Sequence, residues 1–190
     1  MSRKRMLLTF NEARHRGFFD EYPVLPPGID PQLHLSRSDR PQPFWLICSA
    51  DTVLVQMSGE ASVAFKGLAV SGMDLEPGDF VYIPAGAPHR LTPRTQSIQY
   101  RFKAEQAGLE GAAWYCEGCG EEIHREVWDT QSEPTQAAYL RVCEAFNARE
   151  LLRRCAKCGI VHDAVNIAGN RWADIAAELA ASEPSEVASS

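Results

Sequence analysis

The chain has 190 residues, of which 45% are hydrophobic and 23% charged, and its formal net charge is −6 at pH 7. This length accommodates one good-sized hydrophobic core, or a principal domain with a small appendage. A surface that binds nucleic acid or an anionic membrane needs a basic excess, which this composition lacks. We therefore expect neither kind of partner.

The first ten residues, MSRKRMLLTF, are basic and contain only a short apolar run. A secretory signal needs roughly 7–15 consecutive apolar residues, and a membrane span needs about 20. We therefore expect a cytoplasmic protein, in which thiols stay reduced and paired cysteines are typical of metal or redox sites. Residues 1–40 as a whole are rich in proline and are predicted to be an irregular segment that packs on the next domain.

Residues 41–110 are predicted to form a mainly β domain. Glycine- and proline-containing turns separate short runs of β-forming residues, which cover 44–48, 52–57, 61–65, 80–83 and 97–102. Many short strands at regular spacing are typical of a sandwich or barrel. The strand aromatics Trp45, Tyr82, Tyr100 and Phe102 are expected to lie mostly in the core, with one or two available to line a pocket for an aromatic ligand.

Residues 78–89, GDFVYIPAGAPH, match the pattern G-x5-P-x-G-x2-H without a gap. This pattern is the second sequence motif of the cupins, which are jelly-roll barrels built as double-stranded β-helices. Two tight turns flank the short strand in this motif, and the second turn is expected to direct His89 into the barrel. A barrel of this size offers a ligand pocket at its mouth.

The first cupin motif places two histidines and a glutamate at fixed distances before a closing glycine, for which Gly59 is the candidate. Counting back from Gly59 places the glutamate position at Thr52. The two histidine positions then fall near Leu46 and Cys48. With the longer of the two spacings that the motif allows between its histidines and its glutamate, they fall near Trp45 and Ile47. Asp51 is one residue away from the glutamate position, and a slip of one residue in a strand directs a side chain to the opposite face.

A mononuclear Fe(II) site of the 2-His-1-carboxylate kind needs three facial protein ligands. Here His89 is the one expected ligand that remains, with Cys48 as an unusual second donor. The sequence thus argues against an intact catalytic Fe(II) site in the barrel. The alternative for His89 is a barrel histidine that is satisfied by hydrogen bonds.

Residues 111–165 contain two C-x-x-C-G segments, formed by Cys116, Cys119, Cys155 and Cys158. Four thiolates leave no open coordination position, so they predict one closed, structural site for Zn(II) or a rubredoxin-type Fe ion. A redox-active dithiol is the weaker alternative, because such motifs usually open a helix in a βαβ unit. His124 and His162 follow the two segments and are expected to support the fold rather than bind the metal.

Two helices are predicted in the second half of the chain. One covers 134–154, between the cysteine pairs, with Ser132 or Glu133 as the residue that opens it. The other lies within residues 166–190, where apolar residues at 172, 175, 176 and 179 follow helical spacing. The tail 182–190 is rich in Ser, Glu and Pro and is expected to be disordered.

The chain resembles the bacterial 3-hydroxyanthranilate 3,4-dioxygenases, small homodimeric cupins with a C-terminal rubredoxin-like site of four cysteines. The resemblance covers roughly residues 6–163. It rests on MLLT at 6–9, LPPG at 25–28, VQMSG at 55–59, the His89 motif, WYC-x-x-CG at 114–120 with HR at 124–125, and RRC-x-x-CG at 153–159 with His162. The resemblance implies a homodimer that acts on a small aromatic acid with an Fe(II) held by two His and one Glu.

Only His89 matches an iron-ligand position of this family, so the resemblance supports the fold and the four-cysteine site more than the reaction. The leading hypothesis is a divergent dioxygenase-like cupin that acts on or binds a small anthranilate- or tryptophan-derived acid, with standard ring cleavage lost or altered. Its candidate pocket residues are His89, Cys48 and Asp51 for chemistry and Arg90 and Arg101 for the substrate. The alternatives are an active dioxygenase with ligands recruited elsewhere, such as His34, and a non-catalytic sensor or accessory protein.

Overall fold

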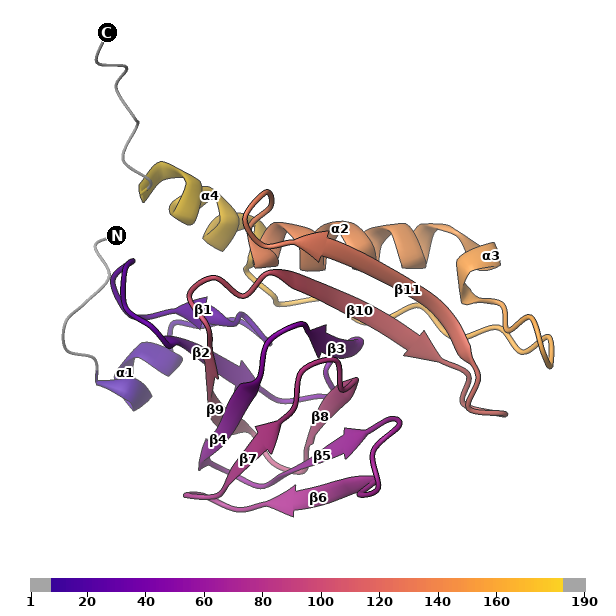
Figure 1. Cartoon of the computed structure of the whole chain (residues 1–190), viewed down its shortest axis with the longest axis horizontal. Coiled ribbons are helices and arrows are strands. Elements are labelled where there is room, and N and C mark those ends of the chain that lie inside the picture. The colour runs from indigo at the N-terminus through magenta and orange to yellow at the C-terminus, as the bar shows by residue number, and fades with distance from the viewer. Residues whose placement is uncertain (1–7, 183–190) are drawn as a thin grey trace, which may run out of the picture.

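The computed structural model describes residues 8–182, which form two antiparallel sheets with the helices of residues 135–182 along one side (Figure 1). Of the tail predicted at 182–190, residues 183–190 lie outside the described residues and Ser182 ends the last helix; Met6 and Leu7 of the MLLT segment also lie outside them. The first sheet has the order β1 (Tyr22–Pro23), β2 (Gln32–Ser38), β9 (Ser97–Lys103), β4 (Thr52–Ser58) and β7 (Phe80–Ile83). The second has the order β11 (Glu122–Asp129), β10 (Leu109–Tyr115), β3 (Trp45–Cys48), β8 (His89–Pro93), β5 (Ala61–Phe65) and β6 (Gly72–Leu75).

The two sheets face each other as a jelly-roll barrel, so the mainly β, cupin-type fold expected from the sequence is confirmed. The five predicted strand runs correspond to β3, β4, β5, β7 and β9, with ends that differ by at most one residue. The other six strands were not predicted. One of them, β2, lies in the segment 1–40 that was expected to be irregular, and it pairs along its whole length with β9.

The first sheet has an unusual polarity, because its polar residues face the barrel interior. On β9 the buried side chains are Ser97, Gln99, Arg101 and Lys103, and the alternate, partly exposed ones are Ile98, Tyr100 and Phe102. A sheet with one face on the core usually shows the opposite arrangement. The expectation that most strand aromatics lie in the core is thus wrong for this sheet. Tyr82 is 55% exposed and its neighbour Phe80 is 69% exposed.

An apolar cluster fills the part of the barrel between β4, β5, β6, β7 and β8. Its members are the buried residues Leu54, Ala61, Val63, Phe65, Leu75, Val81, Ile83, Ala87 and Leu91, from β4 to β8. The buried polar residues of the sheets lie outside this cluster, on β2, β9 and β10, and also at His89 of β8 and at Thr52 and Gln56 of β4.

The largest apolar cluster lies between the second sheet and α2 (Thr135–Ala148), which runs along β10 and β11 (Figure 1). Within it, Trp114 of β10 stacks on Phe146 of α2 with ring centroids 4.1 Å apart and planes 9° apart. Tyr139 contacts Phe44 and Trp172 in the same cluster. This packing holds α2 against the barrel and brings its C-terminal end to the cysteine segments.

The helix expected at 134–154 is confirmed in most of its length but is interrupted. Arg149 has extended backbone angles (φ −121°, ψ 102°) and separates α2 from the single turn α3 (Glu150–Arg153). The backbone of Pro134 begins α2, without a side-chain cap from Ser132 or Glu133. The helix expected near residue 172 is α4 (Trp172–Ser182), whose Trp172 and Ile175 are fully buried, and α1 (Thr9–Ala13) is a short additional helix. Within residues 8–182, no helix has both the length and the apolar character that a membrane span requires.

Candidate functional site

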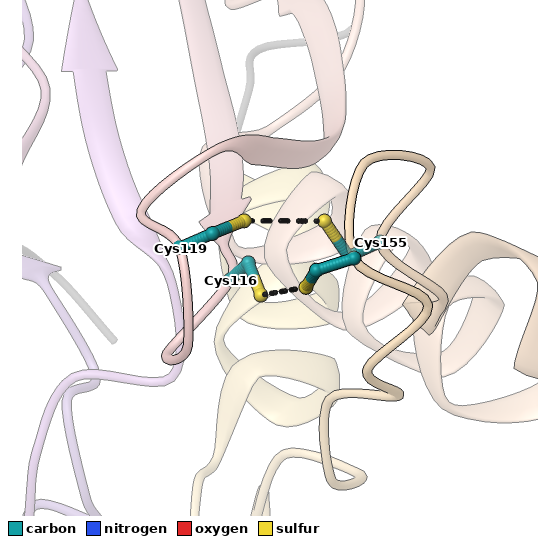
Figure 2. Close-up of side chains that lie close together, drawn as sticks. Cys116, Cys119 and Cys155 are labelled. Carbon is teal, nitrogen blue, oxygen red and sulfur yellow. Dashed lines mark hydrogen bonds between the residues drawn. The ribbon is translucent and has the colours of Figure 1, made fainter.

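The four predicted cysteines converge on one point. Their sulfur atoms all lie within 4.8 Å of one another, with Cys116 and Cys158 at 3.4 Å and Cys119 and Cys155 at 3.6 Å (Figure 2). Four sulfurs around one Zn(II) at about 2.3 Å would be about 3.8 Å apart in a tetrahedron. The donor set therefore fits a tetrahedral metal ion, and metal binding by this group of thiols is the function that the geometry supports directly.

Each cysteine pair lies on a tight turn closed by its glycine. The N–H of Gly120 donates to the carbonyl of Cys116 at 2.8 Å, and the N–H of Gly159 donates to that of Cys155 at 2.9 Å. Both glycines have positive φ values, 74° and 77°, which other residues rarely adopt. The N–H of Cys158, followed by that of Lys157, lowers the pKa of the Cys155 thiol to about 7. The backbone N–H groups of the turns thus favour the thiolate form at Cys155 and at Cys116, whereas the neighbouring thiols raise the pKa of Cys119 and raise that of Cys158 to about 12.

His124 and His162 contact the aromatic core and are not part of the sulfur cluster. The ring of His124 stacks on Trp114, and its Nε2 lies 3.1 Å from Glu126. The ring of His162 packs edge-on against Phe146 with centroids 5.5 Å apart. Both histidines therefore connect the cysteine turns to the core.

His89 is fully buried inside the barrel, on β8. Its Nδ1–H donates to the carbonyl of Ala87 at 3.0 Å, and its Nε2 accepts a hydrogen bond from Nη1 of Arg101 at 2.8 Å. Burial, aided by the charge of Arg101, lowers the pKa of His89 to about 3. The imidazole is accordingly neutral, and both of its nitrogens have partners.

The positions beside His89 carry no metal-binding group. Leu46 pairs directly with His89 across β3 and β8 and is fully buried. Thr52 is buried on β4, and its hydroxyl has no hydrogen-bond partner among the described residues. In place of a metal ion, the guanidinium of Arg101 occupies the bonding direction of Nε2. The residues present therefore do not fit a 2-His-1-carboxylate iron site.

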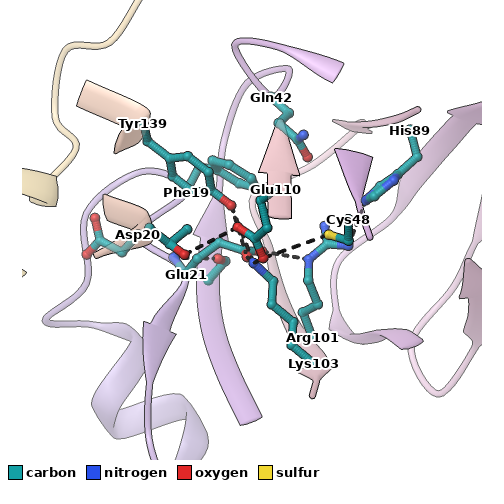
Figure 3. A network of polar contacts seen from close by, with 12 residues as sticks. Phe19, Asp20, Glu21, Gln42, Cys48, His89, Arg101, Lys103, Glu110 and Tyr139 are labelled. Carbon is teal, nitrogen blue, oxygen red and sulfur yellow. Dashed lines mark hydrogen bonds and ion pairs between the residues drawn. The ribbon is translucent and has the colours of Figure 1, made fainter. Parts of the chain in front are cut away.

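Arg101 belongs to a cluster of buried charges on the barrel interior, which Figure 3 shows. Glu21 accepts from Nε of Arg101 at 2.8 Å and lies 2.9 Å from Nζ of Lys103. The second carboxylate, Glu110 of β10, lies 2.9 Å from the same Nζ. Tyr139 completes the cluster, with its hydroxyl 3.5 Å from both Lys103 and Glu21. Two cations and two carboxylates make the cluster electrically neutral, which limits the cost of burying them.

The protonation of this cluster follows from its pairing. Burial acts to raise the pKa of Glu21, but Arg101 and Lys103 hold it well below its usual range. Burial acts to lower the pKa of Lys103, but Glu110 and Glu21 raise it well above its usual range. Glu21, Lys103 and Arg101 are therefore charged at neutral pH.

The backbone at Glu21 is in a rare conformation. Its φ is 46°, and that of Phe19 is 49°, both in the left-handed region that disfavours side chains. The carbonyls of Asp20 and Glu21 accept from the side-chain amide of Gln136, and the carboxylate of Asp20 accepts from the N–H groups of Gly17 and Arg171. These contacts hold the N-terminal segment in the one arrangement that inserts Glu21 between the two cations.

Of the other predicted pocket residues, only Cys48 joins this cluster. Its thiol lies 3.9 Å from Glu110, and burial together with that carboxylate raises its pKa to about 12. Asp51 is exposed and accepts from the N–H of Ala85, and Arg90 is half-buried with Nε donating to the carbonyl of Gln42. The structure thus brings together His89, Arg101 and Cys48, and it places Asp51 and Arg90 elsewhere.

The sequence pattern did not point to Glu21, Lys103 or Glu110, and His34 entered only as a ligand recruited from elsewhere in the alternative of an active dioxygenase. His34 lies on the inward face of β2, opposite Arg101. The alternation of polar and apolar residues along 97–103 was the available signal. This alternation does not show which face of the strand is inside. In most such sheets the polar residues face solvent, which is the opposite of the arrangement here.

A cavity of about 530 Å³ opens beside this cluster. It lies between β2, the β9–β10 connection, the loop and first turn that begin α2, and the end of α4. Lys103, Glu110 and His34 lie on its wall, together with Gln32 and the prolines Pro23 and Pro27. The cavity thus adjoins the charged interior, although the side chains of Lys103 and Glu110 are only 3% and 0% exposed.

No protein-family model matches the sequence. Among curated proteins, the chain is 29% identical over 106 residues to a 3-hydroxyanthranilate 3,4-dioxygenase of Burkholderia cenocepacia, a match that covers 52% of this chain and 59% of the relative. It is 31% identical over 93 residues to that of Paraburkholderia phytofirmans (47% and 52%) and 29% identical over 91 residues to that of Neurospora crassa (47% and 49%). The chain thus spans about half the length of the curated relatives it matches.

Among solved structures, the chain is similar to hydroquinone 1,2-dioxygenase PnpCD with a TM-score of 0.44 and 18% identity, over 50% of this chain and 69% of that one. A cupin-2 domain protein of Shewanella frigidimarina gives a TM-score of 0.43 and 17% identity, over 52% and 94%.

Metal binding at the cysteines is tested by substitution. We expect one Zn(II) or Fe ion per chain in the purified protein, and Cys116→Ser is expected to lose it and to lower the melting temperature, because metal binding there contributes folding free energy. Metal content is measured by elemental analysis and stability by thermal unfolding. Cys143→Ala, at a buried cysteine outside the cluster, is the matched control and should keep the metal. An unchanged metal content in Cys116→Ser would contradict the site.

The neutral state of buried His89 predicts a pH dependence of stability. Its pKa of about 3 in the folded protein lies below the value of about 6.5 in an unfolded chain, so between these values only the unfolded chain takes up the proton. The free energy of unfolding therefore falls as the pH falls, by up to ~1.4 kcal/mol per pH unit for this group. From pH 7 to pH 5, the loss in the unsubstituted protein should exceed that in His89→Gln by about 2 kcal/mol.

Urea unfolding at both pH values measures this difference, with His15→Gln at an exposed position as the control. The cysteine site is present in all three proteins, so its own pH dependence cancels. Equal losses in His89→Gln and the unsubstituted protein would show that His89 already takes up a proton in the folded state.

Proposed function

We propose that this protein is a cupin related to the 3-hydroxyanthranilate dioxygenases that binds a small aromatic acid and does not catalyse Fe(II)-dependent ring cleavage. The observation that carries the proposal is the hydrogen bond of 2.8 Å from Nη1 of Arg101 to Nε2 of His89. It engages the one atom at which a retained iron ligand would bind the metal. The curated relatives that the chain matches over half their length support the aromatic class of ligand.

Three physical arguments weigh against iron beside His89. The lone pair of Nε2 is used by Arg101, and Nδ1 carries the proton that it donates to Ala87. The guanidinium is a permanent positive charge that would repel a divalent cation at this distance. Leu46 and Thr52 offer neither an imidazole nor a carboxylate to complete the ligand set.

In this proposal His89 and Arg101 have a structural role, because they hold the barrel interior together. Cys48 is a buried, protonated thiol. Asp51 has no catalytic role, and Arg90 has no role in binding the substrate. The four-cysteine site binds one structural Zn(II) or Fe ion, whose thiolates require a reducing compartment such as the cytoplasm. The interior is thus a ligand-binding structure rather than an oxygen-activating one.

We also propose that two copies associate through the outer face of β9, β4 and β7. Cross-strand register places two apolar rows on this face, Tyr82–Val53–Phe102 and Phe80–Val55–Tyr100. Phe80 and Tyr82 at the edge are mostly exposed, and contiguous apolar patches of this kind on a monomer are typical of protein interfaces. A second copy that presents the same rows is a matching apolar partner, as a two-fold symmetric contact requires.

The absence of ring cleavage is tested by anaerobic reconstitution with Fe(II), followed by an oxygen-consumption assay with 3-hydroxyanthranilate. We expect no oxygen uptake above the rate of free Fe(II), and the same result for His89→Ala. We also expect the reconstituted protein to bind no more metal than the cysteine site holds. Turnover that His89→Ala abolishes would overturn the proposal and restore the dioxygenase activity.

The proposed dimer is tested by light scattering coupled to size-exclusion chromatography. The unsubstituted protein should have about twice the 21.1 kDa mass of one chain, and Phe80→Glu should be a monomer, because the glutamate places a charge in the apolar contact. Leu151→Glu, at an 81% exposed position on α3, is the matched control and should stay dimeric. A dimer that survives Phe80→Glu would place the interface elsewhere.

A further inference from the structure

The two cysteine turns face each other across the four sulfurs (Figure 2) and repeat one hydrogen-bond pattern. In each turn the N–H of the first cysteine donates at 2.8 Å to the carbonyl of the residue after the glycine, which is Glu121 in the first turn and Ile160 in the second. Directly before the second cysteine stands Gly118 in the first turn and Lys157 in the second. Glu121 is thus the equivalent of Ile160, and Gly118 is the equivalent of Lys157.

These equivalent positions form two contacts between the turns, and the first contact is apolar. A Cβ atom on Gly118 would lie 2.5 Å from Cδ1 of Ile160 and 3.8 Å from Sγ of Cys116. Gly118 is not among the glycines with positive φ, so its backbone conformation is open to other residues. A side chain is excluded there because the tip of Ile160 takes its place. Ile160 therefore covers the first turn beside the buried thiol of Cys116.

The second contact is polar and open to solvent. Nζ of Lys157 lies 3.2 Å from a carboxylate oxygen of Glu121, and the two side chains are 63% and 50% exposed. An exposed ion pair of this kind contributes little stability and is readily broken. The charge of Lys157 also interacts with the thiolate of Cys119, which is exposed. This side of the sulfur cluster therefore combines a weak cover, a positive charge and an accessible thiolate.

The two covers bear on how a metal ion is exchanged. An ion held by four protein thiolates has no open position, so its removal begins when a donor atom from solution displaces one thiolate. That donor must first pass the residues that cover the sulfurs. An apolar cover that is seated in a matching gap excludes it, whereas an exposed ion pair can exchange one carboxylate for another.

We propose that the four-cysteine site has one closed and one open approach. Ile160, seated on Gly118, closes the first approach to water and chelators. The Lys157–Glu121 pair forms the second, which admits a polycarboxylate chelator: one of its carboxylates replaces Glu121 at the ammonium of Lys157 and so comes next to the thiolate of Cys119. The inference goes beyond the proposed function, because it concerns metal exchange and depends only on metal binding by the cysteines.

The open approach is tested by the rate at which the full-length, Zn(II)-loaded protein loses its metal to two chelators in excess. EDTA is a polycarboxylate, and 1,10-phenanthroline is neutral. Lys157→Gln should lower the ratio of the EDTA rate to the phenanthroline rate about threefold, the effect of one charge about 6 Å from an incoming carboxylate in water. Glu121→Gln should raise the same ratio by a similar factor, because it removes the competing carboxylate.

This ratio separates attraction of the chelator from support of the turns, because a merely structural role would change both rates in the same direction. Arg94→Gln is the matched control, since it breaks another exposed ion pair, with Asp74, and should leave the ratio unchanged. Metal remaining on the protein is measured by elemental analysis after rapid desalting. Circular dichroism establishes that each variant is folded.

The closed approach is tested at the contact between Ile160 and Gly118. Ile160→Val removes Cδ1 and should speed metal loss to both chelators by about fourfold, the factor that corresponds to the burial of one methylene group. Gly118→Ala displaces Ile160 and should have a similar effect alone, but little further effect when combined with Ile160→Val, because the clash is then absent. Leu151→Val, at an exposed position on α3, is the matched control and should leave both rates unchanged.

Three outcomes would overturn the inference. Rates that Ile160→Val and Gly118→Ala leave unchanged would show that the first approach is not closed by this contact. An unchanged ratio in both Lys157→Gln and Glu121→Gln would show that the chelator does not enter at the ion pair. A chain that binds no metal would remove the cysteine site and this inference together, and the proposed binding of an aromatic acid would still stand.

Discussion

The buried ion cluster of Glu21, Arg101, Lys103 and Glu110 is the interaction on which the rest of the structure depends. Each group alone would be costly to remove from water, and the cluster is tolerable because its charges sum to zero and its members are mutually hydrogen-bonded. Removing one partner from a buried pair of this kind costs roughly 3–5 kcal/mol, because the remaining charge is left uncompensated. The cluster thus demands that all of its members be in place together.

Those members come from distant parts of the chain. Glu21 belongs to the N-terminal segment, Arg101 and Lys103 to the first sheet, and Glu110 to the second sheet. Tyr139 brings α2 to the same point. The cluster therefore fixes the relative position of the two sheets, the N-terminal segment and the helix, and it explains why the backbone at Glu21 adopts a conformation that an isolated peptide would avoid.

The parts of the structure that could be predicted from sequence are those governed by local pattern. Short β-forming runs between turn residues predicted five of the strands, and the spacing of Cys116, Cys119, Cys155 and Cys158 predicted their convergence. The charged interior could not be predicted in this way. Alternation along β9 identifies two faces, but only the partners contributed by Glu21 and Glu110, 80 residues before Arg101 and 9 after it, make the polar face the inner one.

The guanidinium of Arg101, as the cation beside His89 in the barrel, has a consequence for how the two halves of the molecule respond to their surroundings. A guanidinium cannot be removed by a chelator, does not change oxidation state, and stays protonated at any physiological pH. The barrel therefore holds its internal cation under iron starvation and under oxidative conditions. The cysteine site has no such protection, because its thiolates are oxidisable and its ion is exchangeable. In a cell short of metal, the region that the cysteines hold together would unfold before the barrel does.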